Sequence, residues 1–289
     1  MSLSALAGHL KPTGLAALLS FGAAAVGSIT WGALIVANAR LSPSIPWSVP
    51  VMAAVLLAYW WYLGGRGWPR RTRVARAALL RARLVPARVF GLAWLGGGLA
   101  LVALAGLWVV LVQLTGSGGN PTESQLQGYP LILVALAIAM GSLVSPITEE
   151  ASFRGYAQVI LERRYSPLIA IAISSAFFAA WHGPTQGFFW SKLLFFFLVG
   201  VVFGTIAYLT GSTLPAIPVH IAGDLVFFIA IWPQDAHRQL VGRGGTDIWF
   251  WISVGQVVVF GLLAVLTLRI LAAIRLALPA KATAGAPTG

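Results

Sequence analysis

The sequence has no cysteine and very few charged residues, and each shortage excludes a class of protein. Without cysteine the chain can form no disulfide, and it offers neither a thiolate nucleophile nor a thiolate metal ligand. Only 9% of its 289 residues are charged, whereas a soluble domain usually carries about 25%. Hydrophobic residues make up 58% of the chain, and the mean hydropathy is +0.86. Because this composition cannot build a polar surface, lipid is expected to be the solvent for most of the chain.

Positive charge is the exception, since the formal net charge is +12. Eight arginines lie in one stretch between two apolar runs: Arg66, Arg70, Arg71, Arg73, Arg76, Arg81, Arg83 and Arg88. Basic residues next to membrane spans are typical of cytoplasmic loops that face anionic lipid headgroups. We therefore expect loop 66–88 to be cytoplasmic, with membrane lipids and not nucleic acid as its partner. Both termini then lie in the cytoplasm of a multi-pass protein of the cell inner membrane.

A helix needs roughly 20 apolar residues to cross the hydrocarbon of a membrane. Eight runs approach this length: about 14–37, 47–65, 89–114, 129–150, 167–182, 192–210, 214–232 and 248–272. The sequence therefore predicts an all-α, polytopic membrane protein with about eight transmembrane helices. We interpret residues 1–289 as one integral membrane domain. Its expected parts are N-terminal helices over 1–128, a catalytic helix core over 129–235 and a disordered tail over 276–289.

The chain has seven carboxylates, so each one inside an apolar run needs a reason: Glu123, Glu149, Glu150, Glu162, Asp224, Asp235 and Asp247. Glu149 and Glu150 end the fourth run, where adjacent charges are costly. Arg154 lies one helical turn after Glu150 and can neutralise it. Glu149 lies about 100° away round the helix and can face a different partner. Two interpretations remain open here, a functional site or a helix end at the membrane interface with a solvated ion pair.

Histidines interrupt two later runs. His182 ends the fifth run, and taken alone a histidine in that position is an ordinary interfacial residue. His220 and Asp224 lie inside the seventh run and are four residues apart, so both point from one helix face. A histidine and an aspartate that only pair with each other would explain them, but ionisable groups within a span are rare and usually functional. The interior position therefore favours a functional role for His220 and Asp224.

A helical hairpin would bring the first two groups together. If the fourth and fifth runs turn at residues 165–167, Glu149 lies 14 residues before Arg163 and His182 lies 14 residues after Leu168. At 1.5 Å per residue, both are about 21 Å from the turn. They are then at the same height on neighbouring antiparallel helices. The histidine of the seventh run can join them if the hairpin projects past the membrane, so one shared cavity would explain all three groups.

These motifs, in this order, resemble those of the CAAX-protease and bacteriocin-processing (CPBP, or Abi) family of intramembrane peptidases. The family pattern is EExxxR, then FxxxH, then HxxxN or HxxxD, on separate spans of an eight-helix protein. The matching residues are Glu149-Glu150-x-x-x-Arg154, Phe178-x-x-x-His182 and His220-x-x-x-Asp224. The resemblance covers roughly residues 130–235 and implies an intramembrane endopeptidase that hydrolyses a peptide bond.

Residue roles follow from the resemblance position by position. Glu149 would be the general base that activates a water, and His182 would be its partner on that water. Glu150 and Arg154 would hold the first helix in place. The implied partner is a peptide or protein substrate that reaches the site from the membrane or from the cytoplasmic side.

The resemblance also implies that His220 and Asp224 bind or polarise the scissile carbonyl. The aspartate is a departure from the asparagine of many members, because a charged carboxylate cannot donate a hydrogen bond to an oxyanion. Two histidines with carboxylates can also form a zinc site that keeps an open position for water. Glu149, His182, His220 and Asp224 are therefore candidate metal ligands, and the sequence leaves the cofactor open between zinc and none.

The main alternative is a proton- or ion-coupled transporter that uses the same carboxylates and histidines as a relay. Many transporters carry internal repeats with matching polar breaks in both halves. Here every such group inside a span lies after residue 145, which argues against transport. A non-enzymatic scaffold would gain nothing to offset the cost of the buried charges. The Ala-, Arg- and Gly-rich composition is typical of a bacterial protein and argues against prenylated proteins as substrates.

Overall fold

The computed structural model describes residues 3–118 and 128–277, and this part of the chain contains helices and turns but no strand. Its elements are α1 (Leu3–Leu41), α2 (Ser48–Leu63), η1 (Arg70–Thr72), α3 (Arg73–Leu80), α4 (Ala87–Thr115), α6 (Leu131–Glu149), η2 (Glu150–Ala157), α7 (Gln158–Glu162), α8 (Pro167–Gln186), α9 (Trp190–Thr210), α10 (Ala216–Val226), η3 (Phe227–Ile231), η4 (Trp232–His237), α11 (Val241–Gly244) and α12 (Ile248–Ala277). The predicted all-α fold is confirmed. Of the predicted tail, residues 276 and 277 belong to α12, and the rest lies outside the described residues.

Seven helices of the described part are long and apolar enough to span a membrane. They correspond to seven of the eight predicted runs. The remaining run, 47–65, forms α2, which is apolar but only 16 residues long. The prediction of a polytopic membrane protein therefore stands.

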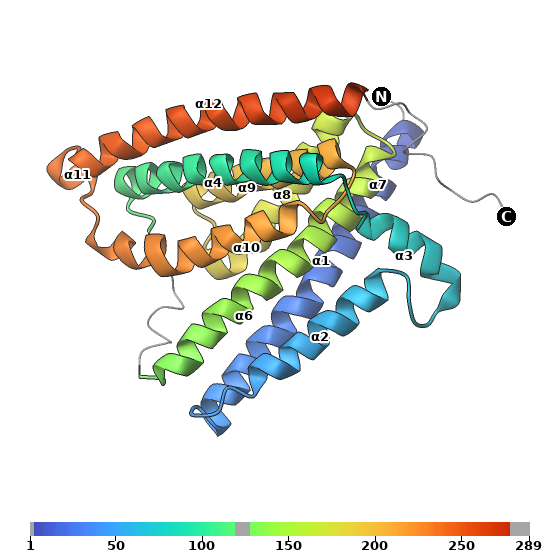
Figure 1. The fold of residues 1–289 in the computed structure, drawn as a ribbon, viewed down its shortest axis with the longest axis horizontal. Coiled ribbons are helices and arrows are strands. Elements are labelled where there is room, and N and C mark those ends of the chain that lie inside the picture. The colour runs from blue at the N-terminus through green and yellow to red at the C-terminus, as the bar shows by residue number, and fades with distance from the viewer. Residues whose placement is uncertain (1–2, 119–127, 278–289) are drawn as a thin grey trace.

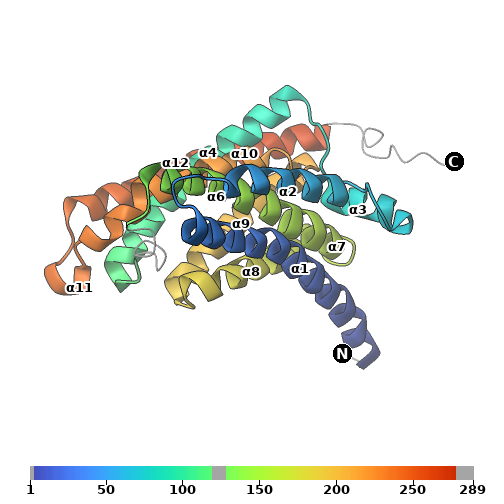
Figure 2. The same ribbon diagram turned by 90° about the horizontal axis from the view of Figure 1, so that it is seen from below.

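Two groups of helices meet at an angle (Figure 1). The helices α1, α2 and α6 contact one another and run together, while α12 packs along α4 in the other group. Figure 2 places α8 beside α1, where Phe21 and Phe177 meet with ring centroids 5.9 Å apart. The start of α1, the basic α3 and the end of α12 lie at one end of the molecule (Figure 1).

The fourth predicted run does not end at its two glutamates. Helix α6 continues through η2, which is a π-helix, and through α7, so that one helical span covers Leu131–Glu162. A π-helical turn inside an α-helix is rare and frequently occurs at a functional site. Glu149 and Glu150 are buried in the middle of this span, with 3% and 0% of their surface exposed. The alternative interpretation, a helix end with a solvated ion pair, is therefore wrong.

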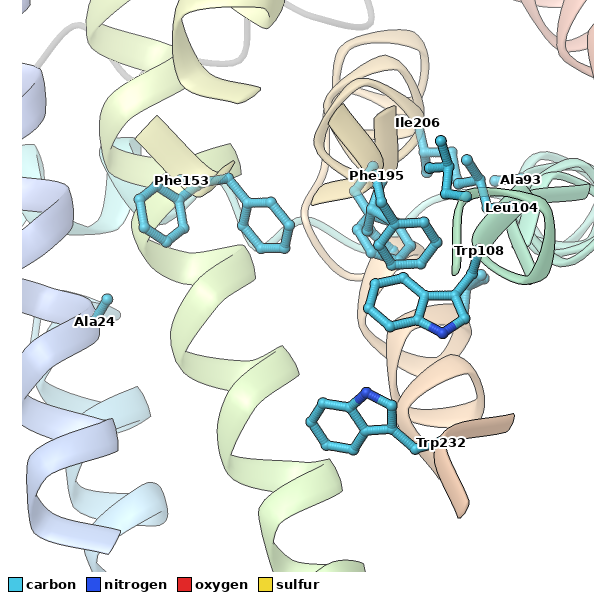
Figure 3. Close-up of a cluster of buried hydrophobic side chains, with 14 of the residues drawn as sticks. Ala24, Ala93, Leu104, Trp108, Phe153, Phe195, Ile206 and Trp232 are labelled. Carbon is cyan, nitrogen blue, oxygen red and sulfur yellow. The ribbon is translucent and has the colours of Figure 1, made fainter. Parts of the chain in front are cut away.

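An aromatic core joins the two helix groups. Trp108 of α4 packs on Phe195 of α9 with ring centroids 4.9 Å apart, and its indole donates a 2.9 Å hydrogen bond to buried Asp235. Phe153 of η2 lies on the side of α1 (Figure 3). Edge-to-face ring contacts of this kind stabilise packing beyond the area that they bury. They join α4 to α9 and to η3, and η2 to α8, around the space described next.

The basic loop is only partly a lipid-facing surface. Six of its eight arginines are exposed, in agreement with the prediction, but Arg76 and Arg81 are not. The Arg76 guanidinium donates to the carbonyl oxygens of Tyr62 and Arg66 at 2.9 and 2.7 Å. These two arginines therefore hold the loop to the helices and do not simply face headgroups.

Candidate active site

A cavity of about 1020 Å³ lies between the two helix groups. Its wall is mainly apolar and comes from α1, α4, α6, α8, α9, α10 and α12, together with η3 and η4. The polar side chains in the wall include Glu149, His182, His220 and Asp224. A large apolar cavity with a few convergent polar groups is the usual form of a ligand or substrate site.

Glu149 is the centre of the polar cluster. Its Oε1 lies 3.9 Å from His182 Nε2, and its Oε2 lies 3.8 Å from His220 Nε2. The same His220 nitrogen lies 3.5 Å from Asp224 Oδ1. Side chains from α6, α8 and α10 thus meet, as the hairpin argument predicts. The 3.8 and 3.9 Å separations exceed direct hydrogen bonds but are within the span of one bridging water.

His182 is oriented by its own helix. Its Nδ1 lies 2.8 Å from the carbonyl oxygen of Phe178, one turn earlier. Because a carbonyl only accepts hydrogen bonds, we assign the proton to Nδ1, which leaves Nε2 facing Glu149 as an acceptor in the neutral ring. The imidazole also stacks on Phe196 of α9, with centroids 3.9 Å apart and planes 15° apart. The motif phenylalanine therefore holds His182 through its carbonyl oxygen and through its ring, whose centroid lies 4.6 Å from that of the imidazole, and Phe196 fixes the plane of the imidazole.

His220 is oriented from behind the cavity. Its Nδ1 lies 3.0 Å from Glu150 Oε1, and its ring stacks on Phe203 with centroids 4.5 Å apart. An ionised carboxylate accepts only, so Nδ1 donates this bond. Nε2 then points toward Glu149 and Asp224.

Glu150 and Arg154 form a pair that is closed off from the cavity. Arg154 Nη1 lies 3.4 Å from Glu150 Oε1, and both side chains are almost completely buried. The guanidinium carbon lies 4.1 Å from the ring centroid of Phe178 and 5.3 Å from that of Phe203. Cation–π contacts of this kind are favourable when they are desolvated. The pair therefore orients His220 and does not itself reach the cavity.

Three further residues of the site were not predicted from the sequence. Ser145 lines the cavity one turn before Glu149 and lies within hydrogen-bonding reach of the Glu149 and Asp224 carboxyl groups. Phe196 and Phe203 back the two histidines from one face of α9. The available signals are the four-residue spacing from Ser145 to Glu149 and the seven-residue spacing between the two phenylalanines.

The four candidate metal ligands do not converge on one point. Among the residues that the structure describes, no group of three or more His, Cys, Asp or Glu side chains has an arrangement that would hold a metal ion. Each histidine does have one nitrogen held by a second partner, which is usual for metal ligands and equally useful in a metal-free site. As they are placed, these four side chains do not fit a metal ion.

Comparison with known proteins agrees with this geometry. Residues 131–226 match the family model described as type II CAAX prenyl endopeptidase Rce1-like. Neither the curated proteins nor the solved structures contain a match. The matched segment begins with α6, ends with α10 and contains all six predicted site residues. It gives no support to the transporter alternative. Residues 131–226 are therefore similar to type II CAAX prenyl endopeptidases of the Rce1-like family.

Proposed function

We propose that this protein hydrolyses a peptide bond in its membrane cavity with a water molecule activated by Glu149 and His182. The observation that carries the proposal is the 3.9 Å separation of Glu149 Oε1 from His182 Nε2 at the wall of a mainly apolar cavity. A carboxylate and a neutral imidazole at this distance can both accept hydrogen bonds from one water. Geometry of this kind meets the first requirement for a general base.

The proposed reaction begins when Glu149 takes a proton from the bound water. The water oxygen bonds to the scissile carbonyl carbon, and the carbonyl electron pair moves to its oxygen. When the tetrahedral intermediate collapses, the carbon–nitrogen bond breaks and Glu149 returns the proton to the leaving amine. His182 holds the water through Nε2, because its other nitrogen donates to Phe178.

The oxyanion of the intermediate needs donors, and we assign these to His220 and Asp224. The Nε2 of His220 lies 3.8 Å from Glu149 and faces the cavity side of the cluster. A protonated His220 donates from this nitrogen while Nδ1 remains bonded to Glu150. Asp224 can donate when it is protonated. Donors positioned in advance commonly account for about 10²–10³-fold of the rate in acyl transfer.

We propose a peptide or protein substrate that enters from the membrane or from the cytoplasmic side. The apolar wall suits an apolar segment or a lipid modification next to the scissile bond. We further propose that loop 66–88 and both termini are cytoplasmic, in the cell inner membrane. Six exposed arginines in the loop support this orientation. In intact cells, an impermeant thiol reagent should label Gly118→Cys and not Ala77→Cys, and the reverse pattern would invert the orientation.

Cleavage in a defined membrane tests the function. The purified protein in proteoliposomes is incubated with membrane-anchored peptides, with and without a prenylated cysteine, and the products are identified by mass spectrometry. We expect cleavage of one internal peptide bond above the background of a Glu149→Gln preparation. Proton or ion flux across the same vesicles without any cleavage would overturn the proposal in favour of transport.

A further inference from the structure

Arg81 turns inward from the end of the basic helix α3. It has a φ of 52°, and among the described residues it alone, apart from glycines, has a positive φ. Its guanidinium forks between two acceptors: Nη1 lies 2.7 Å from Glu162 Oε2, and Nη2 donates a 3.0 Å bond to the carbonyl oxygen of Arg154. A planar guanidinium suits two acceptors held at a fixed angle.

The acceptors of this fork belong to the site helix. Arg154 lies in η2, the same π-helical segment that begins with Glu150. Glu162 ends α7 and accepts a 2.8 Å hydrogen bond from Gln158, which also donates to the carbonyl oxygen of Gly204 in α9 at 2.9 Å. The side chain of Arg81 therefore connects the loop to η2 and α7 directly, and to α9 through Glu162 and Gln158.

The backbone of the loop rests directly on η2. A Cβ atom on Gly155 would lie 3.0 Å from the carbonyl oxygen of Leu79 and 3.2 Å from that of Leu80. Such contacts are tighter than a side chain normally tolerates, so the glycine permits the close approach. The strap, as we name residues 79–83, is thus packed against the helix one residue from Arg154.

The other edge of the strap holds the turn that leads into α10. Thr213 donates from its backbone nitrogen to the Arg81 carbonyl at 3.2 Å, and from its hydroxyl to the Leu80 carbonyl at 3.1 Å. Ser212 donates from its hydroxyl to the Arg83 carbonyl at 2.6 Å. Helix α10 starts at residue 216 and carries His220 in its second turn.

We propose that Arg81 is a positioning residue that sets the distance between Glu150 and His220. The 3.0 Å bond between these two side chains joins η2 to α10, and the strap binds to η2 and to the start of α10. Arg81 also holds the carbonyl of Arg154, whose guanidinium pairs with Glu150. The inference rests on the proposed function for its effect on rate, but its geometric content is independent of that function.

Arg81→Lys is the first test, with Arg83→Lys as a matched control two residues away. A lysine can pair with Glu162, but a single ammonium group does not reproduce the fork. A displacement of about 1 Å in an active site costs about 10²-fold in rate. We expect kcat to fall between about 10- and 10²-fold in Arg81→Lys, with KM within about twofold. Arg83 is exposed, so its variant should keep the wild-type kcat.

A spectroscopic signal of His220 separates positioning from a loss of folded protein. The proton on His220 Nδ1 is observed by NMR of protein labelled with ¹⁵N-histidine and assigned with His220→Gln. We expect its resonance to shift or disappear in Arg81→Lys and to remain in Arg83→Lys. This measurement needs no substrate, so it decides the inference even if the wild-type protein cleaves nothing and the proposed function fails.

Two results would overturn the inference. One is an unchanged His220 resonance in Arg81→Lys, whether or not kcat falls. The other is an equal change in both lysine variants. If Arg81→Lys does not fold, Glu162→Gln replaces it, because it keeps the loop sequence and removes the charge that pairs with Arg81, while the amide oxygen can still accept from Gln158. The same shift of the His220 resonance is expected there, and its absence counts against the proposal.

Discussion

Glu149 and Glu150 are neighbours in the chain, yet they lie in two different regions of the molecule. Glu149 belongs to the cavity wall, where its contacts to two histidines are 3.8 and 3.9 Å long. Glu150 lies in the packed interior behind that wall, where it has a 3.0 Å bond to His220 and an ion pair with Arg154. One step round a helix, about 100°, produces this separation.

The two regions suit different tasks. Long contacts around a carboxylate leave room for a water and a substrate atom, which a general base requires. Short contacts between buried groups fix a side chain in one geometry, which an orienting residue requires. The comparison therefore assigns chemistry to the cavity side and positioning to the packed side. Substitutions on the two sides can break this division or make it sharper.

The largest effect is expected from Glu149→Gln. Glutamine keeps the size and the hydrogen bonding of the side chain but cannot take a proton. Loss of a general base usually costs about 10²–10⁴-fold in kcat. Tm should change little, because in the described part of the chain no charged group lies at hydrogen-bond distance from Glu149, and so none is left buried without its partner. Peptide cleavage and thermal unfolding in the same detergent measure both. Cleavage at the wild-type rate would remove the proposed mechanism.

Glu150→Gln should lower both stability and rate. Arg154 would remain as a buried charge without its carboxylate, a change that costs on the order of 3 kcal/mol. His220 would lose a charged acceptor, so we expect kcat to fall by roughly 10²-fold. The measurements are Tm and kcat under the conditions used for Glu149→Gln.

A double variant provides the control for this prediction. Glu150→Gln combined with Arg154→Met removes both charges and should recover part of the lost stability, because the unpaired cation is gone. The rate should not recover, since His220 still lacks a carboxylate. If the double variant regained the rate, Glu150 would be a structural residue only.

Much of the fold could be predicted because membrane spans depend on length and composition. The run 89–114 becomes α4 (Ala87–Thr115), and the run 192–210 becomes α9 (Trp190–Thr210). The extent of the fourth run was misjudged. Two carboxylates in sequence look like the end of a span, but Arg154 compensates them inside the protein and the helix continues to Glu162.

Some residues of the site could likewise be predicted from the sequence, and others could not. The six predicted residues were recognisable because ionisable groups are rare inside apolar runs. Phe196 and Phe203 were not, because phenylalanine is ordinary in a membrane span and only the histidines beside them give them meaning. Arg81 was hidden among eight arginines of one loop. Its inward turn depends on a backbone conformation and on Glu162, which lies 81 residues later in the chain.

The phenylalanines extend the comparison to the histidines. Both line the cavity, but Phe196, which stacks on His182, is partly exposed, whereas Phe203, which stacks on His220, is fully buried. An aromatic contact contributes about 0.5–1.5 kcal/mol, so either change to leucine should lower kcat by about three- to tenfold. Only Phe203→Leu should also lower Tm, because it leaves a buried space.

Phe197→Leu is the matched control for these variants. Phe197 is the direct neighbour of Phe196 and, among the described residues, is not part of the cavity wall. Its substitution should leave kcat unchanged. Equal losses in all three variants would mean that helix α9 responds to any change of packing, and the stacking argument would fail.

The smallest effect is expected from Asp224→Asn. If Asp224 acts by donating a hydrogen bond to the oxyanion, the asparagine amide donates at least as well, and kcat should stay within about threefold of the wild-type value. The variant is almost isosteric, and the 3.5 Å contact with His220 Nε2 is not a short bond whose loss would unfold the site.

Activity of the wild-type protein in excess chelator and its metal content by mass spectrometry are measured alongside. If Asp224 instead binds a metal, asparagine would weaken that binding, and activity would fall together with metal content. If His182→Ala and His220→Ala also lose zinc and activity together, the reaction depends on a metal, and activation of the water by Glu149 alone is wrong. Retained activity in Asp224→Asn and in chelator would place the oxyanion donor on the same cavity side as the base, and would leave Glu150 as the carboxylate that only positions.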